Sequence, residues 1–299
     1  AKDLFPHLNV IGKADITVSV PLKYEVIATE LLSFKSKDHQ TTNYHYINNF
    51  SHKNNFNCSI AKYNKVDTCV GIFYMLNNPL RTDITLSLQK ARTYMNEHFG
   101  YRNINSDIVY AAIPDGFGSF TIEGVKVVYI QESAFNSVED LNQIIHEFIH
   151  LGWNAKSDEI TQRIRFFDEA FTTYFELRVM EFLMNKSYMI DKLIDNYNMQ
   201  ISSGEYKVVA ISEFGKYGYG DFSYTIGAIF LYNLCLFLGT NLFDEITTIF
   251  LNKYSNIPAT LQDFCNTYLT NVSIVKQNEL KVFLDRWLYS TDEYIKYLK

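Results

Sequence analysis

The sequence is poor in cysteine, and its cysteines form no recognisable framework. Four occur in 299 residues, at positions 58, 69, 235 and 265, and none has CxxC spacing. So few and so scattered, they exclude a disulfide scaffold. A single bridge between Cys58 and Cys69 is compatible with their spacing, but no other feature of the sequence supports it.

An excess of basic residues is also lacking. The chain has 27 Lys and Arg against 33 Asp and Glu, which gives a formal net charge of -6. Proteins that bind nucleic acids need a basic surface to meet the phosphate charge, so we expect no nucleic acid partner.

No apolar run is long enough to cross a bilayer. The most apolar one, from Phe222 to Leu238, is uncharged, but it contains Asn233 and is shorter than the roughly 20 residues that a transmembrane helix needs. It predicts a buried helix, and we expect no membrane span within this chain. Internal repeats, low-complexity runs and charge blocks are missing as well.

What is present is the composition of a globular protein whose pattern changes from β to mixed. With 47% hydrophobic residues, the chain can bury a large core in one large or two moderate domains. From residue 14 to about 75 the pattern is β, with strands predicted at 14–20, 24–29, 42–47 and 69–75. Helical spacing begins after Pro79 and predicts a helix from Thr85 to Phe99, closed by Gly100 as a left-handed C-cap residue. Two further strands at 107–113 and 125–130 bracket a Gly-rich turn. Helices follow to the end, among them predicted helices at roughly 187–202, 222–238, 241–254, 259–269 and 277–289. We therefore expect an α+β fold, with a β-sheet domain at 1–78 and a second domain at 79–299, divided into 79–239 and 240–299.

The segment QIIHEFIHLGW, residues 143–153, carries the strongest chemical signal. Apolar residues at helical spacing, and Ser137 with Asp140 resembling a capping box, predict a helix here. On a helix, His146 and His150 project from one face and Glu147 lies beside them. Two such imidazoles can bind one zinc ion, and the carboxylate can accept a proton from its water. By itself the motif leaves the choice between a metal site and an ordinary helix open.

A catalytic zinc site usually has a third protein ligand, and Glu169 is the natural candidate. Eighteen residues separate it from His150, enough for one helix to end and the next to turn back toward the metal. Asp168 would point about 100° away and is expected to face solvent or to support the ligands. Glu176, two turns after Glu169, is either a supporting partner or a simple surface charge.

HEFIH, eighteen residues, and then the Glu of DEAFTTYFE resemble the zinc signature of the aminopeptidase N family of gluzincin metallopeptidases. The segment at 223–239 is similar to the family's YEKGA segment, and residues 4–21 to a passage of its amino-terminal β domain. DRWLYS, residues 285–290, resembles its closing helix. Thermolysin-type enzymes have an interval one residue longer, and in glycyl aminopeptidases the glutamate comes later.

This resemblance implies a thermolysin-like catalytic domain, with a small mixed sheet and helices, preceded by part of an antiparallel β domain. It also implies one zinc ion on His146, His150 and Glu169, a peptide substrate, and Tyr224 as the oxyanion stabiliser.

The chain departs from the family at the GAMEN motif, whose glutamate holds the free amino terminus of the substrate. The motif aligns with GSFTIEG at 118–124, so that Thr121 stands in place of the glutamate. On a strand, Glu123 would share the face of Thr121 and could substitute. The expected substrate-binding residues are Gly118, Ser119, Phe120, Thr121 and Glu123.

The sequence thus predicts zinc-dependent peptide hydrolysis of aminopeptidase type, with Glu147 as general base. Two alternatives stay open, an endopeptidase and a zinc-bearing module that binds peptides with little turnover. A purely structural zinc site is disfavoured, because no Cys or His lies at a spacing that would fill the fourth position.

The sequence starts at Ala1, with no signal-peptide pattern ahead of the folded part. We expect a chain cut from something longer, either a soluble enzyme or an extracytoplasmic domain of a membrane-anchored parent. The nearness of the catalytic unit to the carboxy terminus favours the second.

Overall fold

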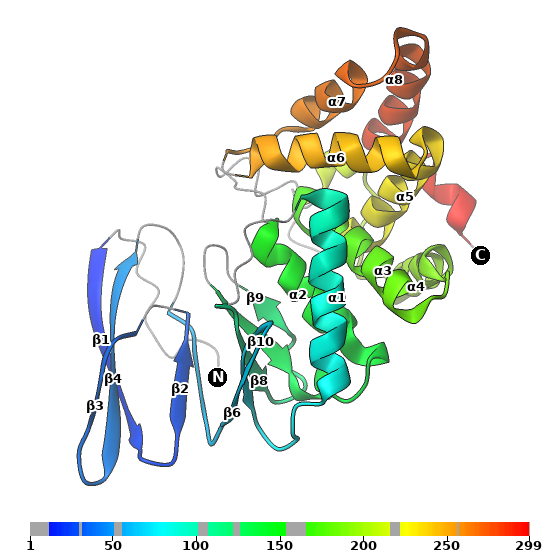
Figure 1. Cartoon of the computed structure of the whole chain (residues 1–299). Helices are drawn as coiled ribbons and strands as arrows, with labels where there is room; N and C mark the ends of the chain where they lie inside the picture. The colour runs from blue at the N-terminus through cyan, green and yellow to red at the C-terminus, as the bar shows by residue number, and fades with distance from the viewer. Residues whose placement is uncertain are drawn as a thin grey trace. The chain divides into compact units, whose positions relative to one another are not determined.

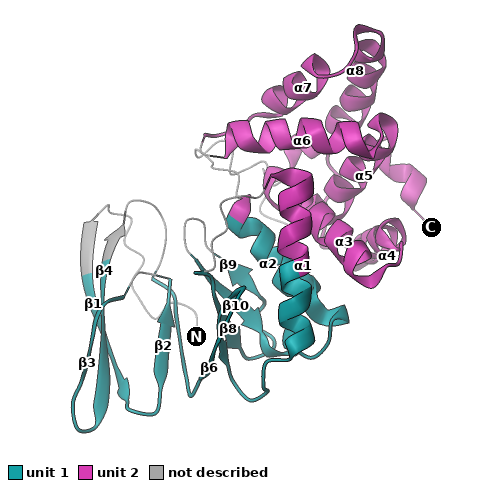
Figure 2. Ribbon diagram, viewed as in Figure 1, with its two compact units in different colours: residues 1–89, 104–151 teal, residues 90–103, 152–299 magenta. Residues whose placement is uncertain are grey.

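A computed structural model describes the chain at residues 12–29, 32–50, 56–100, 107–121, 126–153, 166–215, 222–255 and 257–298. The chain forms two compact units, residues 1–89 with 104–151 and residues 90–103 with 152–299 (Figure 2). Sheets and helices are both present, as the predicted α+β class requires. None of the helices in these stretches combines the length and apolar character that a membrane span needs.

The first unit begins with two small antiparallel sheets (Figure 1). One has the strand order β1-β4-β3 and the other pairs β2 with β5. Along β1, Val18 and Val20 face inward while Thr17 and Ser19 are exposed, the alternation of a sheet with one buried face. The bounds are β1 (Gly12–Pro21), β2 (Glu25–Ala28), β3 (Leu32–Lys37), β4 (Thr41–Phe50) and β5 (Cys58–Ala61).

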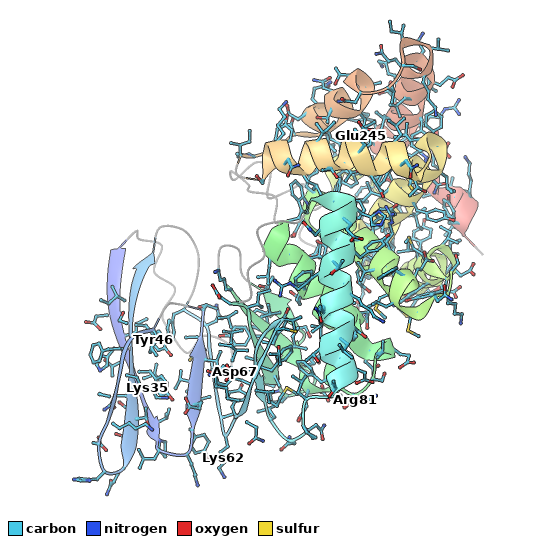
Figure 3. All side chains as sticks on the ribbon, in the orientation of Figure 1. Lys35, Tyr46, Lys62, Asp67, Arg81 and Glu245 are labelled. Carbon is cyan, nitrogen blue, oxygen red and sulfur yellow. The ribbon has the colours of Figure 1, made fainter. Side chains whose placement is uncertain are left out.

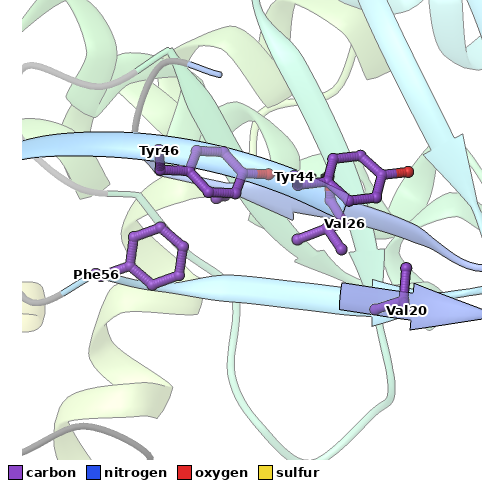
Figure 4. Close-up of a cluster of buried hydrophobic side chains, with 6 residues drawn as sticks. Val20, Val26, Tyr44, Tyr46 and Phe56 are labelled. Carbon is purple, nitrogen blue, oxygen red and sulfur yellow. Dashed lines mark hydrogen bonds between the residues drawn. The ribbon is translucent and has the colours of Figure 1, made fainter. Parts of the chain in front are cut away.

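Aromatic and branched side chains fill the space between these sheets (Figure 4). Tyr44 and Tyr46 are buried with Val20, Val26 and Phe56. The Tyr44 hydroxyl donates to the Glu25 carboxylate at 2.6 Å, so its polar end is satisfied at the edge of the cluster.

A five-stranded mixed sheet forms the rest of the first unit's β structure. Its order is β6-β7-β8-β10-β9, with β7, β8 and β10 parallel and the outer strands antiparallel to their neighbours. The two central strands β8 and β10 are buried along most of their length, as parallel strands covered on both faces should be. The bounds are β6 (Asn64–Thr68), β7 (Gly71–Met75), β8 (Val109–Ile113), β9 (Phe120–Thr121) and β10 (Val127–Gln131).

Helix α1 (Thr82–Phe99) follows this sheet's first two strands. It starts three residues before the predicted Thr85. Arg81, labelled in Figure 3, directly precedes the helix and pairs with Asp83 of its first turn. Gly100 ends it in the left-handed conformation, φ +66°, and its N–H donates to the Asn96 carbonyl at 3.1 Å. The predicted glycine C-cap is confirmed.

The second unit is helical, and phenylalanines make up much of its core. Phe166, Phe171, Phe250 and Phe264 contact one another with ring centroids 5.4 to 6.0 Å apart. The predicted helices at 187–202, 222–238, 241–254, 259–269 and 277–289 are all present, with ends shifted by a few residues. The bounds are α3 (Phe171–Met184), α4 (Met189–Ser203), α5 (Ala228–Leu238), α6 (Thr240–Tyr254), α7 (Leu261–Thr270) and α8 (Ile274–Tyr289).

A largely buried ion pair joins three helices, α1, α3 and α6. Arg178 of α3 donates to the Asp244 carboxylate of α6 through both terminal nitrogens of its guanidinium group, at 2.5 and 3.1 Å. His98, near the end of α1, lies 3.0 Å from the same carboxylate. Burial lowers the pKa of Arg178, but the hydrogen bond to Asp244 and the charges of Tyr174, Tyr94 and Asp244 together outweigh burial, so the pKa is raised.

Candidate metal centre and substrate edge

The histidine motif lies on helix α2 (Asn142–Gly152). The capping box predicted at Ser137 and Asp140 is not formed. The Asp140 N–H donates to the Ser137 carbonyl, and the Ser137 hydroxyl donates to the Asp140 carboxylate at 2.8 Å. The Asp140 N–H thus bonds to the Ser137 carbonyl and not to its hydroxyl, because a 3-10 turn, η2 (Glu139–Leu141), leads the chain into α2.

The two histidines lie one turn apart on α2. Their ring centroids are 4.9 Å apart and the rings are close to perpendicular. His146 is partly exposed, His150 is 8% exposed and Glu147 is 7% exposed. Ile144, Ile145, Phe148 and Ile149 anchor the rest of the helix in the core. This fixes the direction of the polar face, as the helical spacing predicts.

Glu169 lies in a π-helical turn, η4 (Phe166–Ala170), that runs directly into α3. Its side chain is 7% exposed. Side chains hold the carbonyls just before it: Trp153 Nε1 donates to the Phe167 carbonyl at 2.5 Å, and Thr172 Oγ1 to the Asp168 carbonyl at 2.8 Å. These bonds fix the backbone from which the Glu169 carboxylate projects.

The structure brings together the three predicted zinc ligands. His146, His150 and Glu169 each offer one ligand atom, and these atoms lie within 4.8 Å of one another. Two imidazole nitrogens and one carboxylate oxygen are the donor set of a catalytic zinc site, which keeps its fourth position open. The residues present therefore fit a zinc ion.

Tyr224 lies in a second π-helical turn, η6 (Ser223–Gly227), which runs directly into α5. The other four residues of this turn are buried, and Tyr224 is partly exposed. Thr225 Oγ1 donates to Gln200 of α4 at 2.7 Å, which anchors the turn. Whether Tyr224 acts on a substrate stays a prediction.

The predicted substrate-binding residues lie in the Gly-rich turn and in strand β9, at the end of the strand order of the five-stranded sheet. Gly118 has φ +76°, in the left-handed region, and Ser119 follows it. Phe120 and Thr121 form β9, which pairs with β10 on one side only in the described part of this sheet. Glu123 lies outside the described residues.

Two glutamines that the sequence analysis missed bind this turn to α2. Gln143 Oε1 accepts hydrogen bonds from Ser119 Oγ at 2.8 Å and from Gln131 Nε2 at 3.0 Å. Gln131 Oε1 accepts from the Gly116 N–H at 2.7 Å, and its own N–H donates to Ser119 Oγ at 3.1 Å. A signal was available, because Gln143 lies three, four and seven residues before His146, Glu147 and His150, and so shares their helix face.

Glu176 is 7% exposed, so its interpretation as a surface charge is wrong. It lies on α3, seven residues after Glu169, a spacing that places both residues on the same helix face. Burial and the negative charges of Glu176 and Glu181 raise the pKa of Tyr188 to about 12. Asp168 is partly exposed, as expected of a residue pointing away from Glu169.

Comparison with known proteins finds likeness in structure and not in sequence. No protein-family model matches the chain, and no curated protein does. The M1 zinc metallopeptidase of Deinococcus radiodurans superposes with a TM-score of 0.65 at 13% identity, over 93% of this chain and 64% of that one. A mutant of that enzyme bound to a Tyr-Ser-Ala substrate gives a TM-score of 0.64 at 12% identity, over 93% and 63%.

A mutant two-domain M1 zinc metallopeptidase bound to L-tryptophan gives a TM-score of 0.64 at 13% identity, over 90% of this chain and 63% of that one. The chain thus spans a little under two thirds of the length of the structures that it matches. At this identity the likeness concerns the fold. The chain has the fold of the corresponding part of M1 zinc metallopeptidases.

Proposed function

We propose that the protein is a zinc-dependent peptidase, and that its action on peptides resembles that of the aminopeptidase N family. The observation that carries the proposal is the group formed by His146, His150 and Glu169, whose ligand atoms lie within 4.8 Å of one another. Its donors are those of catalytic zinc, with three protein ligands. The shared fold with M1 zinc metallopeptidases supports the same conclusion independently.

A zinc ion on these ligands would polarise the scissile carbonyl and lower the pKa of a water molecule toward about 7. Glu147 follows His146 on α2 and is almost fully buried, so its carboxylate is held beside the ligands. In the proposed mechanism it accepts the proton of the attacking water and later delivers it to the leaving amine. Tyr224 donates a hydrogen bond to the oxyanion that develops from the carbonyl.

The substrate in this proposal is an extended peptide that pairs with strand β9. The strand lies at the end of the order β6-β7-β8-β10-β9, so one side of its main chain can bond to a peptide. Main-chain pairing is independent of side-chain identity, which suits an enzyme that acts on varied peptides. Thr121 offers a hydroxyl where the family has a carboxylate, and this hydroxyl donates to the Val127 carbonyl at 3.4 Å.

The test uses zinc-loaded protein with one peptide in two forms, a free amino terminus and an acetylated one. Cleavage of the free form alone supports an aminopeptidase, and cleavage of both forms supports an endopeptidase. Binding of both without cleavage would contradict the enzyme and favour a peptide-binding module.

Glu147→Gln is the matched control for this assay, since it keeps the shape of the side chain and removes the base. We expect unchanged zinc content and a loss of turnover of about 10²- to 10⁴-fold. Full activity in this variant would refute the role of Glu147.

A further inference from the structure

The two π turns η4 and η6 pack directly against each other at Ala170 and Gly227. An ideal Cβ on Gly227 would lie 2.4 Å from the Ala170 Cβ. Two carbon atoms in van der Waals contact are about 3.5 to 4.0 Å apart. A side chain at position 227 is therefore incompatible with the present separation of the two turns.

Gly227 is needed for space and not for backbone conformation. Its φ of -60° and ψ of -44° are ordinary right-handed helical values that any residue adopts. The next nearest atoms to the ideal Cβ are Ala170 Cα at 3.6 Å and Phe166 Cδ2 at 3.7 Å, both ordinary contacts. Of the three atoms nearest to the ideal Cβ, the Ala170 methyl carbon is thus the one that would clash with a side chain at position 227.

The surroundings of the contact leave little room for relaxation. Ala170 is fully buried, and Gly227 is buried too. Phe166, which begins η4, contacts Phe230, Phe171 and Phe264 with centroids 5.4 to 5.5 Å apart. A methyl group added at position 227 must therefore move one π turn against a packed aromatic core.

Each turn also carries a residue of the proposed site, close to the contact. Glu169 directly precedes Ala170, and Tyr224 lies three residues before Gly227. We propose that the contact between Gly227 and Ala170 is a positioning element that sets the separation of the two turns, and with it the place of Tyr224 relative to Glu169. The inference rests on the proposed function for its effect on catalysis, and on the metal group alone for its effect on zinc binding.

The test combines Gly227→Ala with its compensating change. In Gly227→Ala we expect zinc affinity, measured by chelator competition, to fall about tenfold, and kcat to fall by up to about 100-fold with little change in KM. In the double variant, Ala170→Gly with Gly227→Ala, one methyl group replaces the other, and the nearest contacts return to 3.6 Å and beyond. We expect both quantities to recover to within about threefold of the parent, a margin that allows for a glycine inside a helix.

Gly204→Ala is the matched control in the same unit. Gly204 has φ +70° and nothing within 4 Å of its ideal Cβ, so alanine there strains the backbone without touching either turn. It should lower the melting temperature and leave zinc affinity and kcat unchanged. A merely structural role for Gly227 would give this same pattern.

The outcomes separate the two proposals. A folded Gly227→Ala protein with parental zinc affinity and kcat would overturn the inference, as would a folded double variant that recovers neither. If Gly227→Ala does not fold, the double variant alone decides, and parental zinc affinity in it supports the inference. If the parent binds zinc but cleaves no peptide, the proposed function fails while the zinc affinities still test the contact.

Discussion

Predicted site residues lie in two different surroundings, the buried π turns η4 and η6 of the second unit and the exposed Gly-rich turn of the first. Around Glu169 and Tyr224 the chain is buried, and Gly227 is required because Ala170 leaves no space. Around Ser119 the chain is loosely surrounded. Gly118 has a left-handed conformation and no atom within 4 Å of an ideal Cβ, and Phe117 is 69% exposed. Close packing fixes the first region in addition to its hydrogen bonds, whereas the second region is held by hydrogen bonds and backbone conformation. Changes in the first should affect metal and rate, and changes in the second should affect substrate binding.

The largest effect is expected from Glu169→Ala. Zinc affinity should fall by more than about 100-fold, because removal of a direct ligand exceeds the 10- to 100-fold loss caused by an outer partner. Zinc content after dialysis, measured by atomic absorption, checks this. Asp168→Ala is the adjacent control and should retain zinc. Full zinc content in Glu169→Ala would remove this residue from the ligand set.

Tyr224→Phe should come next, with kcat lower by about 10²- to 10³-fold and zinc content unchanged. Tyr224 is the one residue of η6 that is not buried, and the substitution removes its hydroxyl and keeps the ring. Steady-state kinetics on the cleaved peptide measures it. A rise in KM at constant kcat would mean that Tyr224 binds substrate in the ground state and does not act on the oxyanion.

Gln143→Ala tests the open region, since it removes the acceptor of two hydrogen bonds from Ser119 and Gln131. At about 1 kcal/mol for each bond, KM should rise by up to roughly 30-fold with a smaller change in kcat. Asn142→Ala, one residue earlier, is the control and should leave KM unchanged. A loss of zinc from Gln143→Ala would contradict the expectation that changes in this region affect substrate binding and not the metal.

Gly118→Ala should have the smallest effect. Alanine in the left-handed region costs about 1 kcal/mol, so KM should rise about fivefold. Asparagine tolerates this conformation better, and Gly118→Asn should recover much of the loss. Equal effects of alanine and asparagine would indicate that the side chain, and not the backbone, is responsible. Gly227→Ala tests the need for space beside Ala170, and Gly118→Ala tests the need for a positive φ. The two variants therefore test the packed and the exposed region separately.

The sequence predicted the helices of the second unit well, because each carries a long apolar period that only a helix satisfies. Strands β3, β5 and β6 were missed. All six residues of β3 are exposed, so no alternation of buried and exposed side chains marks it. The other two are short, and periodicity over four or five residues carries little signal.

The candidate metal group of His146, His150 and Glu169 was predicted because HEFIH and the interval to Glu169 specify both residue type and spacing. The π turns that hold Glu169 and Tyr224 were not, since an inserted residue in a helical turn leaves the same apolar spacing on either side. The bonds of Gln131 and Gln143 to Ser119 were also missed. They join residues 12 and 24 positions apart, a pairing that only the folded chain determines.

The ion pair between Arg178 and Asp244 has a consequence for local unfolding. Its carboxylate also lies 3.0 Å from His98, and the Arg178 guanidinium lies over the Phe99 ring at 5.0 Å, so the last turn of α1 is bound to α3 and α6. Opening that turn would leave the largely buried guanidinium of Arg178 without its full set of partners. Backbone amides of residues 96–99 should therefore exchange with deuterium as slowly as those in the middle of α3 and α6, instead of fraying like an ordinary helix end.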